Sequence, residues 1–185
     1  MIRDKKIHTM VTAALLVAVG IAIPMFFPKI VIPPASFTLA SHVPIFIAMF
    51  ISPYVALAVC LGTTVGFFFS TPLIVALRAF SHLIWAMIGA ILLKKYPDLL
   101  HSPKKAGLFG LLLAVIHALG EVAVTTWFYF SGMAAENFYQ NGFVFSVLLM
   151  VGVGTIVHSM VDYGISLLVW KGISKRVSIP VSVRV

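Results

Sequence analysis

Apolar residues form long runs along this chain, separated by short polar connections rich in proline, lysine and serine. Most of these runs approach the ~20 residues that a helix needs to cross the hydrocarbon of a bilayer. The pattern predicts an all-α, polytopic membrane protein in which residues 1–185 form a single domain of six transmembrane helices. The predicted spans cover about residues 7–27, 38–51, 54–69, 73–93, 106–130 and 143–170.

Basic residues gather at three places along this pattern, and they predict the orientation of the chain. They precede the first span, flank the connection between the fourth and fifth, and follow the sixth: Arg3, Lys5 and Lys6; Lys94, Lys95, Lys104 and Lys105; Lys171, Lys175, Arg176 and Arg184. With six spans all three clusters fall on one side, which the positive-inside rule identifies as the cytoplasm. A five- or seven-span count would split the clusters. Segments two and three could be confused with a re-entrant hairpin, but an even number of full spans fits the charges better. Both termini are therefore predicted to be cytoplasmic, in a multi-pass protein of the cell membrane.

Composition supports the membrane class and excludes others. The chain is 61% hydrophobic and 10% charged, whereas a soluble domain carries about 25% charged residues. The net charge of +8 would suggest nucleic acid in a soluble chain, but most of it lies at span ends, so no nucleic-acid partner is expected. The single cysteine, Cys60, lies in an apolar run without a metal-binding spacing. No metal and no cofactor are predicted.

Ionisable residues inside the spans are the candidate functional groups. They form three pairs at helical i, i+4 spacing: Arg78/His82, His117/Glu121 and His158/Asp162. Trp85 follows one turn after His82 on the same face. A guanidinium in hydrocarbon costs about 2.5–3.5 kcal/mol, so Arg78 either snorkels to the interface, pairs within the bundle, or faces a cavity and holds an anion. It lies roughly 9 Å below the outer end of its span, and Glu121 roughly 15 Å below its own, so one outward-facing cavity would suit both.

Two classes of function are compatible with these groups. They line a binding pocket, or they carry catalytic, metal or proton-transfer chemistry in a small intramembrane enzyme or proton-coupled carrier. The chain contains no HExxH, no GxSxG and no paired-carboxylate motif, and no spacing marks its histidines as metal ligands. Binding is therefore favoured over catalysis. His158 and Asp162 are interpreted as a packing pair or a subunit contact.

Aromatic and amide residues near the outer ends complete the candidate pocket, with Phe68, Trp127, Asn137 and Asn141 as its remaining members. An interfacial aromatic belt and ordinary turn residues are the alternatives. Small residues recur every fourth position in two spans. Gly62 and Gly66 are interpreted as internal packing, whereas the ridge Ala14, Ala18 and Ala22 suits internal packing and external docking equally.

The chain resembles the substrate-binding S components of energy-coupling factor (ECF) vitamin transporters, which are ABC-type importers. The resemblance rests on the six spans in about 180 residues, the alanine ridge and the run PASFTLASHVPIFIAMFISPYVALAVCLGTTVGFFFSTPLIVALRAFSH. The resemblance implies a vitamin-binding transport subunit that is not itself an enzyme. Its partners would be a transmembrane T component, docked on Ala14, Ala18 and Ala22, and two ATPases that hydrolyse ATP. Loops 29–37, 69–72 and 131–142 would gate the pocket.

The identity of the vitamin depends on Arg78, which favours an anion such as pantothenate or nicotinate. The neighbouring Glu121 leaves neutral, hydroxylated ligands such as pyridoxine or hydroxymethylpyrimidine open. Pantothenate is the preferred prediction, because its carboxylate suits Arg78 while its amide and hydroxyl groups suit His82, Asn137 and Asn141.

Overall fold

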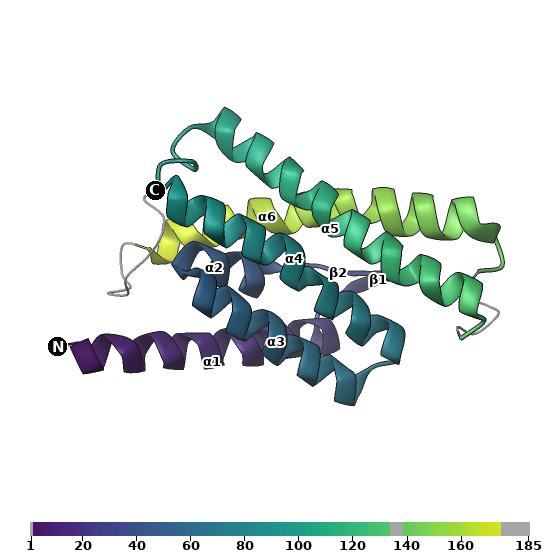
Figure 1. Ribbon diagram of the computed structural model, residues 1–185, viewed down its shortest axis with the longest axis horizontal. Coiled ribbons are helices and arrows are strands. Elements are labelled where there is room, and N and C mark those ends of the chain that lie inside the picture. The colour runs from purple at the N-terminus through teal and green to yellow at the C-terminus, as the bar shows by residue number, and fades with distance from the viewer. Residues whose placement is uncertain (1, 134–138, 175–185) are drawn as a thin grey trace.

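The computed structural model describes residues 2–133 and 139–174, and it is a bundle of helices with one small hairpin (Figure 1). The elements in chain order are α1 (Ile2–Phe26), β1 (Lys29–Ile32), β2 (Ala35–Thr38), α2 (Val43–Ile51), α3 (Pro53–Ser70), α4 (Leu73–Lys95), α5 (Pro103–Ser131), η2 (Val144–Val153) and α6 (Gly154–Ile173). The segment η2 is a ten-residue π-helix that runs directly into α6. The predicted class, an all-α polytopic membrane protein, is confirmed.

Among the described residues, five helices are long and apolar enough to cross a membrane: Lys6–Phe26, Pro53–Ser70, Leu73–Lys95, Pro103–Ser131 and Val144–Ile173. The prediction of a full second span at 38–51 is not confirmed. In its place α2 has nine residues, about 14 Å at 1.5 Å per residue, against the ~30 Å of bilayer hydrocarbon. All its residues from Pro44 to Ile51 are buried. The segment is therefore apolar because it lies in the protein core, not because it faces lipid.

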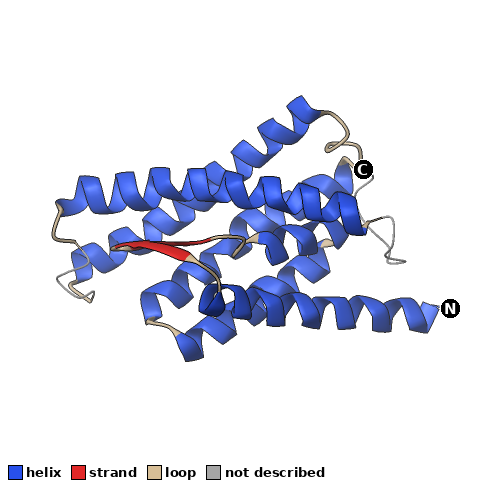
Figure 2. Ribbon diagram, turned by 180° about the vertical axis from the view of Figure 1, so that it is seen from behind, coloured by secondary structure: helices blue, strands red, loops and turns tan. Residues whose placement is uncertain are grey.

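The segment before α2 is an antiparallel β-hairpin and not the loop that was predicted. Lys29 pairs with Thr38 and Ile32 with Ala35, with Pro33 and Pro34 in the turn. Figure 2 shows the two strands lying lengthwise along the helices beside the end of α1. Four-residue strands are too short to leave a periodic signal in an apolar sequence. The hairpin and α2 together return the chain to the end where α3 starts.

The first and last helices place both ends of the described chain on one side of the bundle. In Figure 1, α1 begins and α6 ends at the left, where α4 also ends and α5 begins. The lysines at the α4–α5 connection therefore lie at the same end as the start of α1, as the charge pattern predicts. That this end faces the cytoplasm stays a prediction.

Helix packing separates an apolar core from a polar region. Gly62 and Gly66 of α3 lie directly against Val17 and Ile21 of α1, so close that a Cβ at either glycine would overlap these side chains. This confirms that the glycine pair serves internal packing. Around α2 the core is aromatic. Phe46 packs on Trp85 with ring centroids 4.8 Å apart, and the far side of Trp85 meets the polar cluster described next.

Candidate functional site: a polar cavity beneath the hairpin

A cavity of about 300 Å³ lies between the β-hairpin and the helices α1, α3, α4, α5 and α6. The hairpin residues 33–38 form one wall, and Lys29 is an exposed basic residue on its lining. The charged and imidazole side chains come from the turn before α2 and from α4, α5 and α6: His42, Arg78, His82, His117, Glu121 and His158. Ionisable groups concentrated at one intramembrane cavity indicate a ligand or ion site.

Arg78 and Glu121 form the central ion pair of this cavity. Arg78 Nε donates to Glu121 Oε2 at 2.9 Å, and Arg78 Nη2 donates to the same oxygen. The two residues are 9% and 4% exposed, so neither charge is well hydrated. Thr155 Oγ1 also donates to Oε2 at 3.2 Å, and His82 Nε2 lies 3.2 Å from Oε1. The arginine therefore does not snorkel to the interface. It pairs within the bundle at the cavity wall.

The Arg78 guanidinium retains donors for a ligand. It has five N–H bonds, and three of them serve Glu121 and the carbonyl oxygen of Pro34, which accepts from Nη1 at 3.2 Å. Two N–H bonds remain, one on Nη1 and one on Nη2, and guanidinium N–H bonds are good donors to a carboxylate. The contact with Pro34 also ties the guanidinium to the hairpin, so a ligand at Arg78 would contact α4 and the hairpin together.

A second buried carboxylate, Asp162, holds the turn between β2 and α2. It accepts from the backbone N–H of Ala40 at 2.8 Å and from that of His42 at 2.9 Å, and its Oδ2 lies 2.9 Å from His42 Nδ1. Ala40 has φ of 66°, a left-handed conformation that alanine adopts only where its surroundings impose it. The sequence interpretation of His158 and Asp162 is a packing pair or a subunit contact. The actual contacts of Asp162 fix the position of His42 at the cavity.

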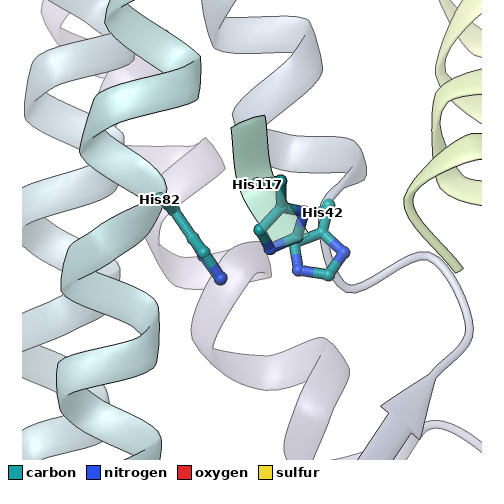
Figure 3. Close-up of side chains that lie close together, drawn as sticks. All are labelled: His42, His82 and His117. Atoms are coloured by element: carbon teal, nitrogen blue, oxygen red, sulfur yellow. The ribbon is translucent and has the colours of Figure 1, made fainter. Parts of the chain in front are cut away.

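Four histidines meet on one side of the cavity. The ring centroid of His42 lies 4.9 Å from that of His82, 4.7 Å from that of His117 and 5.0 Å from that of His158. Figure 3 shows three of these rings converging: His82 of α4, His117 of α5 and His42 of the turn before α2. Trp85 closes this cluster from behind, with its ring 5.2 Å from His117.

The residues predicted for the pocket divide into two groups. Arg78, His82 and Glu121 line the cavity, and Trp85 is fully buried behind its histidines. Phe68 and Trp127 do not line it, because their side chains point outward and are 59% and 54% exposed. Asn141 is exposed in the turn before η2, and Asn137 lies outside the described residues.

Sequence reasoning placed residues 29–37 at the gate of the pocket without predicting a hairpin there, and it did not assign His42 and Thr155 to the site. For His42 the available signal was a histidine beside Pro44 at the start of an unusually short apolar run. Thr155 carries no signal of its own, because its role depends on reaching Glu121 across the interface between α5 and α6.

The alanine ridge lies on the outer surface of the bundle. Ala14 and Ala18 are exposed and Ala22 is half-buried, whereas the adjacent side of α1 meets α3 through Val17 and Ile21.

A membrane bundle that encloses a polar, ligand-sized cavity under a hairpin defines a small-molecule-binding membrane protein. A comparison with known proteins makes this specific. The chain is 42% identical over 181 residues to a curated protein from Lactococcus lactis subsp. cremoris (strain MG1363), named niacin transporter NiaX, and the match covers 97% of this chain and 80% of that protein. No protein-family model matches the chain, and no solved structure matches it.

The chain belongs to the family of this niacin transporter, within the ECF S-component class indicated by the sequence. It is a multi-pass membrane protein and a transport subunit, not an enzyme. The prediction of pantothenate as its vitamin is not supported, and nicotinate, given as an alternative, fits better.

Proposed function

We propose that this chain binds niacin, as the nicotinate anion, and serves as the S component of an ECF-type importer. The observation that carries the proposal is the relationship to niacin transporter NiaX over nearly the whole chain. At 42% identity across 97% of the chain, the segments that build the cavity all lie within the matched length or at its edge. The match to the relative therefore spans the segments that carry the cavity residues.

The chemistry of the cavity supports a small aromatic carboxylate. The two remaining N–H bonds of Arg78 suit the carboxylate, and the imidazoles of His42, His82 and His117 suit the edge and the nitrogen of a pyridine ring. At about 300 Å³ the cavity is at the small end of ligand pockets, which span about 300–1,000 Å³. Pantothenate is disfavoured because the described asparagine predicted to bind its polar groups, Asn141, lies away from the cavity.

The partners follow from the same proposal. A T component would dock on the exposed face of α1 that carries Ala14 and Ala18, and two ATPases would supply the energy. The hairpin would act as the gate of the cavity, because it forms one wall and contacts Arg78 through Pro34. In this arrangement the lysine-bearing end of the bundle faces the cytoplasm.

Calorimetric titration of the purified chain in detergent tests the ligand. Nicotinate is expected to bind at one site per chain. Nicotinamide lacks the carboxylate and is expected to bind at least about 30-fold more weakly, because one partner of a buried charge pair is then missing. Mass spectrometry of any co-purified ligand provides an independent identification. Pantothenate or pyridoxine binding more tightly than nicotinate would contradict the proposal.

Trp85 offers a second readout of the same event. Of the three tryptophans, Trp85 packs on the cavity histidines, Trp170 packs on Phe50 and Trp127 is exposed. Nicotinate should therefore change the fluorescence of the wild-type chain, and of the matched variants Trp127→Phe and Trp170→Phe. It should leave that of Trp85→Phe nearly unchanged. A full response in Trp85→Phe would place the ligand away from this cavity.

A further inference from the structure

We propose that His42, His82 and His117 bind one divalent transition-metal ion, Zn²⁺ in the first instance, at the inner side of the cavity. The sequence predicts no metal, because the three histidines are far apart in the chain and show no ligand spacing. The fold brings them together from three segments (Figure 3). The inference rests on the proposed function in one respect: the open coordination position of the metal would face nicotinate.

The distances between the ring nitrogens are slightly longer than in a metal-bound three-histidine site, and metal binding would shorten them. One ring nitrogen of each residue lies within 4.8 Å of the others, and all three residues are buried. Zinc binds imidazole nitrogen at about 2.0–2.1 Å, which separates two ligands of a tetrahedral site by about 3.4 Å. Ring rotations of the order of 1 Å close the difference. Three protein ligands leave the fourth position for an exchangeable ligand.

Neighbouring side chains already hold two of the rings in the way that metal-binding histidines are held. His42 Nδ1 lies 2.9 Å from Asp162 Oδ2, and His117 Nδ1 lies 3.3 Å from Ser159 Oγ. Such contacts to one ring nitrogen orient the other nitrogen toward a metal. In His117 that other nitrogen, Nε2, is buried without a hydrogen bond, and Glu121 Oε1 lies beyond hydrogen-bond distance from it, at 3.6 Å. A buried polar atom without a partner is costly, and a metal ion would satisfy it.

The charges around the cavity point to the same site. Glu121 is matched by Arg78, but the side chains that contact Asp162 among the described residues are those of His42, His158 and Ser41, none of them an arginine or lysine. Asp162 is 0% exposed, and nicotinate would add a further negative charge. A buried charge without a counter-charge is strongly unfavourable. A divalent cation held by neutral imidazoles would balance both the aspartate and the ligand.

The ligand set favours zinc among the available metals. Imidazole suits zinc, copper, iron and nickel, whereas calcium and magnesium require oxygen ligands. A second group of possible ligands, His42, His158 and Asp162, shares one histidine with the first. This second group is the competing location for the metal ion. Variants can distinguish the two sites, because His82 and His117 belong only to the first and His158 only to the second.

The full chain in detergent, stripped with a chelator and titrated with Zn²⁺ or Co²⁺, provides the test. One ion per chain is expected by plasma mass spectrometry, with the intense visible absorption of tetrahedral Co²⁺. Stoichiometric binding should be lost in His82→Gln and in His117→Gln, and retained within a few fold in His158→Gln and in the exposed-site control His101→Gln. Asp162→Asn, which removes the partner of a ligand, should weaken binding about 10- to 100-fold.

Several results would overturn the inference. They are the absence of stoichiometric metal in the wild-type chain, a six-coordinate Co²⁺ spectrum, or unchanged binding in folded His82→Gln and His117→Gln. Loss in His158→Gln with retention in His82→Gln would move the ion to the competing location. The wild-type measurements do not depend on whether a variant folds. Zinc binding without nicotinate binding would reject the proposed function alone, and nicotinate binding without zinc would reject the metal site alone.

Discussion

Replacing Arg78 with alanine is expected to weaken nicotinate binding by about 30-fold or more, the effect of removing one member of a buried, hydrogen-bonded charge pair. The ligand loses the two guanidinium N–H bonds that remain after Glu121 and Pro34 are satisfied. The same substitution leaves the Glu121 carboxylate buried without its arginine. This costs about 3–5 kcal/mol of stability, so the single variant alone does not separate ligand binding from folding.

A charge-neutral double variant makes that separation. Arg78→Gln with Glu121→Gln removes both charges together and leaves two groups that can hydrogen-bond, so the thermal unfolding temperature in detergent should stay much closer to that of the wild type than in Arg78→Ala. Nicotinate binding should still be lost. Lys29→Ala is the matched control, because Lys29 is also a cavity-lining base but is exposed and screened. A folded double variant with wild-type affinity would refute the role of Arg78.

The sequence predicted the parts of this site that depend on single-helix geometry. Arg78 and His82 are one turn apart, as are His117 and Glu121, so each pair had to share a face of its helix. Spacing alone could not bring the two faces together. The Arg78–Glu121 pair requires α4 and α5 to be neighbours in the correct rotation, and the Thr155 contact requires α6 as well.

The predicted second span is not confirmed, because hydropathy has two physical causes. Residues 38–51 are apolar in the same degree whether they face lipid or fill a protein core, so α2 was predicted as a span although all its residues from Pro44 to Ile51 are buried. The same error hid the hairpin and the turn that carries His42. Because Asp162 holds that turn from 120 residues away, no local pattern could have placed His42 in the site.

Replacing Ala18 with tryptophan is expected to leave nicotinate binding unchanged and to reduce uptake to background. Ala18 is exposed on α1, about 100° round the helix from Val17, which contacts α3, so the larger side chain is expected to fit without disturbing the fold of the chain. A partner helix that approaches closely over Ala14 and Ala18 would be pushed away by the indole. Binding is measured on the purified chain, and uptake in cells that also express a T component and its ATPases.

The next residue of the helix provides the control. Val19 is also exposed, but it lies about 100° further round α1, so Val19→Trp adds the same bulk to the same helix beside the alanine face. Uptake should stay above about half of the wild-type rate in Val19→Trp, because this side chain points away from the alanine face that would contact the partner. Equal loss in both variants would mean that α1 tolerates no bulk on its lipid-facing side. Normal uptake in Ala18→Trp would remove the alanines from the docking surface. Only loss in Ala18→Trp with retention in Val19→Trp assigns the docking surface to the alanine face.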